Sequence, residues 1–227
     1  MKQTLILLHG GLGNSQSLKE IENYFSKTWR VFNIDFPGHG DRVEDNVRFS
    51  IDLFTDHLHS LILENNIDEP VVFGYSMGGY VALNHALKHP GIIRKIITYG
   101  TKLSWNPDEA KEQVRYLDPD KIREKVPEFA SMLEARHGVH WDHVVSHTAE
   151  FITELGEEPS ICTQTAVYVN TPAWLLRGSE DWMVTKKESE RFISCAPNAT
   201  YIEIEGLPHE IERVDTAILC RKIEELL

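Results

Sequence analysis

Cysteine is scarce in this sequence, with three residues among 227 and no C-x-x-C pair. An odd number of cysteines, here Cys162, Cys195 and Cys220, predicts neither a disulfide framework nor a zinc site. Such cysteine usage is typical of proteins in a reducing cytoplasm. Long hydrophobic runs are absent as well. The N-terminal run Thr4–Leu8 has five residues, fewer than a signal-peptide core, and no run approaches the ~20 residues of a membrane span. We therefore expect a cytoplasmic protein.

Positive charge is also in short supply, since 23 lysines and arginines face 35 aspartates and glutamates. The net charge of -12 creates a field that repels nucleic-acid phosphates and anionic lipid, so we expect neither nucleic acid nor a membrane as a partner. Hydrophobic residues make up 41% of the chain, enough for an ordinary globular core. The length predicts one α/β domain over residues 1–227 and leaves the oligomeric state open.

Short apolar runs alternate with amphipathic stretches along the chain, the pattern of a mainly parallel sheet covered by helices. Ser50 precedes one helical run, and Thr185 with Glu188 forms a capping box before another. Ser17 with Glu20 forms a second such pair. The strands that we predict are Thr4–Leu8, Val31–Asp35, Val71–Phe73, Lys95–Tyr99, Ala173–Leu176 and Thr200–Ile204.

One long segment interrupts this alternation. About seventy residues separate the strand that ends near Tyr99 from the one that starts near Ala173, far more than a crossover needs. The segment contains Asp118-Pro119, a cap followed by a first-turn proline, and reads as two or three helices. We predict that residues 101–171 form a helical cap, or lid, inserted over the carboxyl edge of the sheet.

The sharpest local motif is Gly74-Tyr75-Ser76-Met77-Gly78, a G-x-S-x-G that directly follows an apolar strand and directly precedes a helix. On such a turn a serine is held in a strained backbone conformation that lifts its hydroxyl clear of the sheet. The pentapeptide also occurs in ordinary loops, but the strand-then-helix context favours a nucleophile. We predict that Ser76 is that nucleophile.

A serine hydroxyl needs a base, and the base needs a carboxylate that fixes its tautomer. His209 lies between the last predicted strand and the last helix, so it should reach the same sheet edge as Ser76. Asp181 follows the fifth strand and should reach that edge too. Glu180 and Asp215 are rivals, but Glu180 should point away from its neighbour and Asp215 should fall inside the closing helix. We predict Asp181 as the acid.

The loop His9-Gly10-Gly11-Leu12-Gly13 follows the first strand. Attack on a carbonyl puts negative charge on oxygen, which backbone amides of this loop and of Met77 are suited to stabilise. The alternative is a phosphate-binding loop. That alternative is weak, because the third glycine of a dinucleotide fingerprint is missing and no G-x-x-x-x-G-K-[ST] motif occurs.

Together, the glycine loop, the segment Asn33–Gly40, the serine motif, Gly178–Asp181 and Pro208–Glu210 resemble the α/β-hydrolase superfamily. The order serine, aspartate, histidine matches that family. The resemblance implies an α/β-hydrolase fold, here with six strands because the usual first hairpin is missing, and it implies Gly11 and Met77 as the oxyanion hole. Relatives commonly carry glycine before the catalytic histidine, where this chain has Pro208.

Four histidines lie in the predicted cap, and His143 with His147 have the i, i+4 spacing of a metal pair. Valine, not glutamate, follows His143, so the zinc-protease motif fails and we expect no metal. His137 and His140 are the other two. Trp182 either lines a pocket or packs internally.

The activity implied is that of a carboxylesterase-like serine hydrolase, which needs no cofactor and takes a small-molecule acyl substrate. A small or medium ester, thioester or lactone is expected, since the fold by itself defines no substrate. Relatives with the same triad also perform carbon–carbon bond hydrolysis, perhydrolysis and an elimination in menaquinone synthesis. Some serve instead as small-molecule receptors.

Overall fold

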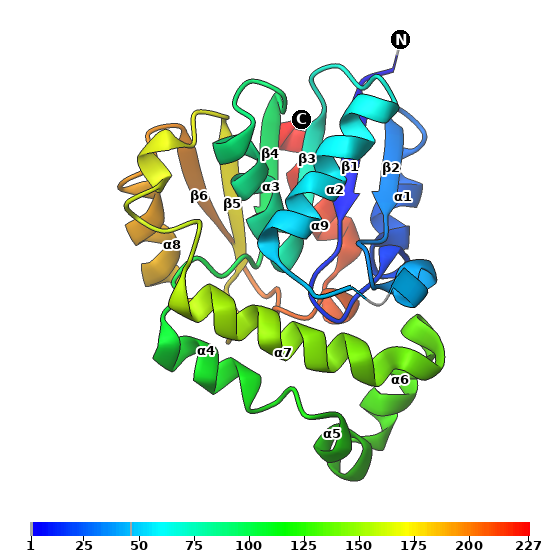
Figure 1. The fold of residues 1–227 in the computed structure, drawn as a ribbon. Helices are drawn as coiled ribbons and strands as arrows, with labels where there is room; N and C mark the ends of the chain where they lie inside the picture. The colour runs from blue at the N-terminus through cyan, green and yellow to red at the C-terminus, as the bar shows by residue number, and fades with distance from the viewer. Residues whose placement is uncertain (1, 46) are drawn as a thin grey trace.

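A computed structural model of the chain describes residues 2–45 and 47–227. Its centre is a six-stranded sheet in the order β2-β1-β3-β4-β5-β6 (Figure 1), and every neighbouring pair is parallel. The predicted fold is therefore confirmed. The strands are β1 Thr4–Leu8, β2 Arg30–Ile34, β3 Val71–Tyr75, β4 Lys95–Tyr99, β5 Ala173–Gly178 and β6 Ala199–Ile204.

Strands β2 and β6 each begin one residue earlier than predicted, and β2 ends at Ile34 rather than Asp35. Two other strands run further at their carboxyl ends than their sequences predict. β3 continues to Tyr75, which pairs with Tyr99, and β5 continues to Gly178, which pairs with Ile204. Glycine is depleted in strands, so the prediction stopped before Gly74 and Gly178. Both glycines stand where another part of the chain passes too close for a side chain.

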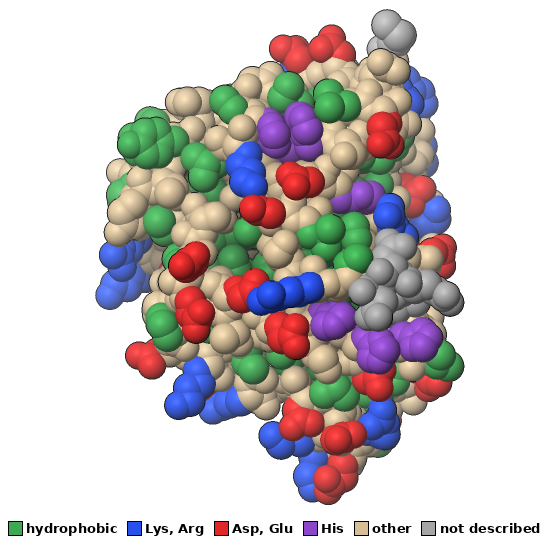
Figure 2. Space-filling model, viewed as in Figure 1, with side chains coloured by type: hydrophobic (Ala, Val, Ile, Leu, Met, Phe, Trp, Pro, Cys, Tyr) green, Lys and Arg blue, Asp and Glu red, His purple; other side chains and the backbone are tan. Residues whose placement is uncertain are grey.

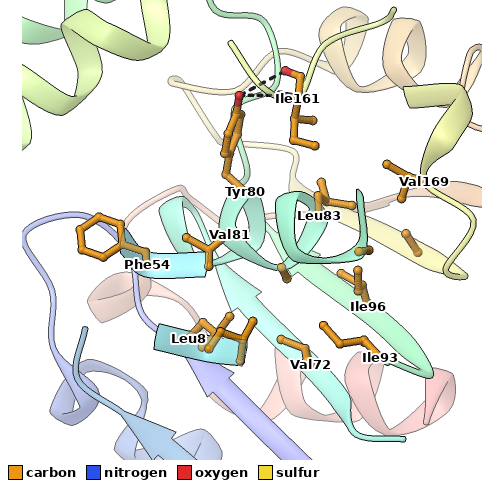
Figure 3. Packing of buried hydrophobic residues seen from close by; sticks show 14 of the residues in the cluster. Leu8, Phe54, Val72, Tyr80, Val81, Leu83, Ile93, Ile96, Ile161 and Val169 are labelled. Atoms are coloured by element: carbon orange, nitrogen blue, oxygen red, sulfur yellow. Dashed lines mark hydrogen bonds between the residues drawn. The ribbon is translucent and has the colours of Figure 1, made fainter. Parts of the chain in front are cut away.

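Helices cover both faces of the sheet, because successive strand residues point to opposite sides. Leu5 and Leu7 pack toward α1 (Lys19–Phe25) and α9 (Thr216–Leu226). Ile6 and Leu8 belong to a second cluster, part of which is shown in Figure 3. It includes residues of the segment between β4 and β5 and of three helices that pack on this face of the sheet. Those helices are α2 Ile51–Glu64, α3 Met77–Lys88 and α8 Lys186–Ile193.

Most of the predicted caps are present, and one is wrong. Ser50 accepts a hydrogen bond at the start of α2, and Thr185 with Glu188 forms the capping box of α8. Ser17 and Glu20 do not form a box. The chain already turns helical one turn earlier, where the backbone N–H of Asn14 donates to Ser17 Oγ (3.4 Å). Short 3-10 helices span Ser15–Leu18, Gly40–Asp45, Gly138–His140, Ala166–Tyr168 and Ile211–Arg213.

The segment between β4 and β5 contains four α-helices, not the predicted two or three, and they lie across the carboxyl ends of the strands (Figure 1). Three of these helices begin with a proline in the first turn, and Asn106 and Asp118 supply side-chain caps. Phe151 and Leu155 on the longest helix join the core cluster of the sheet. The helices are α4 Pro107–Val114, α5 Pro119–Lys125, α6 Pro127–His137 and α7 Trp141–Glu157.

A buried tyrosine fastens the end of this segment to the sheet layer. The Tyr80 hydroxyl on α3 accepts from the Ile161 N–H (2.9 Å) and lies 3.3 Å from the Ile161 carbonyl oxygen, to which it donates (Figure 3). Because Ile161 follows α7, the pair holds the return of the chain toward β5. In the described part of the chain, no helix has the length and apolarity required to cross a bilayer.

Candidate active site

Ser76 occupies a sharp turn between β3 and α3, with φ 49° and ψ -113°. Positive φ is unfavourable for any residue except glycine and costs about 1–3 kcal/mol, so neighbouring structure must impose it. The Ser76 N–H donates to the Tyr99 carbonyl (2.8 Å), and the Thr101 hydroxyl donates to the Ser76 carbonyl (3.0 Å). Residues of β4 and its following loop therefore hold the strained serine.

The glycines on either side of Ser76 are required by close packing. A Cβ at Gly74 would lie 2.4 Å from the backbone of Gly78 and of Gly79, and a Cβ at Gly78 would lie 2.3 Å from the carbonyl oxygen of Leu8. Helix α3 thus packs with its first turn directly against β1 and β3. The motif brings the start of a helix, with its positive dipole end, next to the serine.

The side chains of His209 and Asp181 are in direct contact. Nδ1 of His209 donates to Oδ2 of Asp181 at 2.9 Å, and both side chains are buried. Oδ1 of Asp181 accepts from the backbone N–H groups of Met183 (2.9 Å) and Val184 (2.8 Å). With these contacts the carboxylate is fully engaged and can hold the imidazole in one orientation.

The two rival carboxylates lie elsewhere. Glu180 is exposed to solvent. Asp215 does not fall inside the closing helix, as the sequence predicted, but caps it, accepting from the Ile218 N–H (3.0 Å). The helix starts later than its apolar periodicity suggested, because the Asp215 cap turns the chain at that point.

Pro208 is accommodated by the loop that carries the histidine. The Tyr99 hydroxyl donates to the Pro208 carbonyl. The Leu207 carbonyl oxygen comes so near β5 that a Cβ at Gly178 would lie 1.9 Å from it. Backbone contacts of the neighbouring strands therefore define this loop, and proline leaves the carbonyl acceptor intact.

A cavity of about 240 Å³ opens between the sheet edge and the helices above it, and both Ser76 and His209 line it. Within residues 2–45 and 47–227 no hydrogen bond joins the Ser76 hydroxyl to the imidazole. In enzymes without substrate such a bond is often long and tightens only in the complex. Gly11 and Met77 also line the cavity, and the Met77 N–H, first in its helix, has no intrahelical acceptor.

The walls of the cavity are mainly apolar, and the segment between β4 and β5 supplies half of the lining residues. Trp182 lines it with 60% of its surface exposed, so it forms part of the rim. Sequence reasoning missed Lys102 as a lining residue. Its position three residues beyond the end of β4, at the edge of the sheet that carries the site, is the signal that could have revealed it. The other lining residues are Leu12, Tyr75, Tyr80, Trp105, Gln113, Tyr116, Leu117, Thr148, Phe151, Ile152, Leu155 and Met183.

Comparison with known proteins agrees with this architecture. Residues 3–138, more than half of the chain, match the family described as alpha/beta hydrolase fold. The chain belongs to that family. Among solved structures, this α/β hydrolase superposes on NosK from Streptomyces actuosus with a TM-score of 0.82 at 18% identity, covering 99% of this chain and 97% of that one. A thermophilic esterase from Thermogutta terrifontis gives 0.78 at 20% identity, with 100% and 89% covered.

Relatives of this hydrolase in sequence include esterases and other hydrolases. A Haemophilus influenzae protein provisionally named an esterase/lipase is 23% identical over 98% of this chain and 82% of its own length. Proline iminopeptidase of Saccharolobus solfataricus is 28% identical over 74% of this chain. The chain spans only 56% of that relative.

In this α/β hydrolase, neutral histidines shape the glycine loop. His9 is fully buried; it donates from Nδ1 to the Gly10 carbonyl (2.8 Å) and accepts from the Phe36 N–H at Nε2 (3.1 Å). Burial lowers the pKa of His9 to about 4. His137, at the end of α6, accepts from the Gly40 N–H (3.0 Å) and donates to the Leu12 carbonyl (3.1 Å). Burial also lowers the pKa of His137. Through its hydrogen bond to Leu12, His137 connects α6 to the glycine loop.

The remaining cap histidines lie near one another on the 3-10 helix Gly138–His140 and on α7. Figure 2 shows histidines gathered at the corner where α6 meets α7. The rings of His140 and His143 are 5.3 Å apart, and those of His143 and His147 are 6.4 Å apart. The described residues contain no group of three or more side chains able to hold a metal ion.

Proposed function

We propose that this α/β hydrolase is a serine hydrolase that cleaves a small or medium ester, thioester or lactone through an acyl-enzyme on Ser76. The observation that carries the proposal is the buried hydrogen bond between His209 and Asp181 beside a cavity that Ser76 also lines. A strained serine, a histidine and an engaged carboxylate at one sheet edge are the parts that acyl transfer requires.

The reaction begins when Ser76 Oγ attacks the substrate carbonyl and its proton passes to His209 Nε2. Asp181 holds the proton on Nδ1, so Nε2 is free to accept, and it stabilises the imidazolium that results. The backbone N–H groups of Gly11 and Met77 receive the oxyanion.

Collapse of the tetrahedral intermediate breaks the bond to the leaving group, which takes the proton from His209. A water molecule then loses a proton to His209 and attacks the acyl-enzyme. The acid is released, and the proton returns to Ser76. Apart from the substrate and one water molecule, each step uses side chains and backbone groups of the chain.

The volume of the cavity limits the size of the substrate group that lies within it. An apolar cavity of about 150 Å³ holds one benzene molecule, and the cavity above Ser76 measures about 240 Å³. A group somewhat larger than one aromatic ring therefore fits, such as a medium acyl chain or an aryl ester. Its mainly apolar walls favour an uncharged group against Trp105 and Phe151.

Labelling by a fluorophosphonate probe tests the nucleophile. We expect the probe to modify Ser76, as located by peptide mass mapping, and the S76A variant to lose both labelling and p-nitrophenyl butyrate hydrolysis. S131A, at an exposed position on α6, is the matched control and should keep both. A wild-type protein that neither labels nor turns over the ester, yet gains thermal stability with a small ligand, would be a receptor.

A further inference from the structure

A second cavity, of about 310 Å³, adjoins the one above Ser76. The two cavities share four lining residues: Lys102, Gln113, Trp182 and Met183. We call the second cavity the annex; its own walls come mainly from the loop before α8 and from α8 itself. Figure 1 shows α8 and α4 at the same end of the molecule, and residues of both helices line the annex. A substrate in the first cavity can therefore extend into the annex.

The annex differs from the first cavity in its charge. Three cationic side chains line it, Lys102, Lys187 and Arg191, against two carboxylates, Glu109 and Glu188. The chain as a whole carries a net charge of -12. A concave surface lined by more cations than carboxylates favours anions over the rest of this acidic protein's surface.

Both carboxylates are already engaged. Lys102, whose side chain is 6% exposed, has its ammonium 2.9 Å from Glu109 and 3.6 Å from Glu188. Glu188 also accepts from the backbone N–H groups of Leu103 (3.0 Å) and Thr185 (3.1 Å). Both carboxylates therefore pair with Lys102, and Glu188 also accepts hydrogen bonds from the backbone.

Lys187 and Arg191 have no such partner. They lie four residues apart on α8, so their side chains share one face of the helix. Neither forms an ion pair with an acidic side chain in the part of the chain that the structure describes. Two exposed cations thus line the annex, and among the described residues no acidic side chain pairs with them.

The annex lies on the side of the His209–Asp181 pair. A Cβ at Gly100 would lie 3.1 Å from His209 Nδ1 and 3.3 Å from Asp181 Oδ2, and Lys102 follows two residues later. Trp182 and Met183 directly follow Asp181. Because the histidine gives its proton to the leaving group, the leaving group lies on this side of the carbonyl.

We propose that the annex binds an anionic group, a carboxylate or a phosphate, carried by the leaving alcohol or thiol of the substrate. The proposal rests on Ser76 being the nucleophile. The planar guanidinium of Arg191 can pair with two anion oxygens, and Lys187 adds a mobile point charge. The acyl group then occupies the apolar cavity, and the anion determines which esters are bound.

Matched aryl butyrates test this proposal. The anionic probes are the butyrate esters of 4-hydroxybenzoate and of 4-hydroxyphenyl phosphate, and the neutral reference is the butyrate ester of methyl 4-hydroxybenzoate. We expect wild type to prefer at least one anionic ester through a lower KM. In the K187A/R191A double variant the ratio of kcat/KM, anionic over neutral, should fall about tenfold.

K186A is the matched control, because Lys186 is an exposed cation on the same helix that does not line the annex. It should leave the ratio as in wild type, and added salt should reduce the preference of wild type. An ester that carries its carboxylate on the acyl side, phenyl hydrogen glutarate, should show no dependence on Lys187 or Arg191.

The outcomes separate the two proposals. If wild type cleaves the neutral ester but shows no anionic preference, or if K187A/R191A retains that preference, the annex proposal is overturned and the serine hydrolase stands. A preference confined to the acyl-side anion also overturns it. If wild type cleaves none of the esters and Ser76 does not label, the proposed function itself fails.

Discussion

Replacing Asp181 by asparagine changes one atom and tests the orientation of His209. The backbone N–H groups of Met183 and Val184 both point at Oδ1, so the asparagine must present its carbonyl oxygen there. Its NH₂ group then faces Nδ1 of His209. The imidazole can only accept from that group, so its own proton moves to Nε2, the nitrogen that must receive the Ser76 proton.

The reverse orientation of the amide is costly. It would place NH₂ against the N–H groups of half-buried Met183 and buried Val184 and leave both unsatisfied, at about 1–3 kcal/mol for a buried group. The imidazole is thus held in the wrong tautomer. The same substitution in a serine protease triad lowers kcat by about 10⁴-fold, equivalent to about 5 kcal/mol in the activation barrier. We expect a fall of that order for D181N, with KM little changed.

The assay is steady-state hydrolysis of p-nitrophenyl butyrate, with the folded state checked by circular dichroism and thermal unfolding. D215N is the matched control, because asparagine caps a helix as well as aspartate does and Asp215 only caps α9. It should keep wild-type kcat. If folded D181N retained more than about a tenth of wild-type kcat, Asp181 would not be the residue that orients the histidine.

Three further predictions concern stability, measured by urea unfolding. The free energy of unfolding of G78A should be about 3 kcal/mol lower than that of wild type, or the variant should not fold, because its Cβ would lie 2.3 Å from the Leu8 carbonyl oxygen. Y80F should lose about 1–3 kcal/mol, because the N–H and carbonyl of Ile161 lose their buried partner. Burial lowers the pKa of His137 below its ordinary 6.5, so the unfolded chain binds the proton first. The free energy of unfolding should therefore fall as the pH drops below about 6.5, and less steeply in H137Q.

Each of these has a result that would contradict it. For the glycine, the comparison is G11A, whose Cβ would lie 3.7 Å from Thr148, an ordinary contact; equal stability of G11A and G78A refutes the packing argument. Wild-type stability in Y80F would mean that the Ile161 contacts contribute nothing. A pH dependence in H137Q that matches wild type would remove His137 as its source.

The strands and the main motifs were predictable because their signals are local. A run such as Lys95–Tyr99 contains all the residues of its strand. The turn that holds Ser76 is identified from the flanking glycines and the adjoining strand and helix alone. Two helix starts were predicted wrongly, because in each a hydrogen bond between residues three apart in sequence sets a different cap. Ser17 does not cap with Glu20, because Asn14 engages it first, and Asp215 caps its helix instead of lying within it.

Sequence alone determined that strands alternate with helices, that Ser76 stands on a strained turn, and that His209 and Asp181 follow strands toward one edge of the sheet. Only the tertiary structure decided that Asp181 contacts His209 while Glu180 stays in solvent, and that Lys102 enters the cavity. The physical reason is that local patterns depend on neighbours within a few residues. Contacts across the sheet edge depend instead on how far loops reach and which backbone N–H groups hold each side chain.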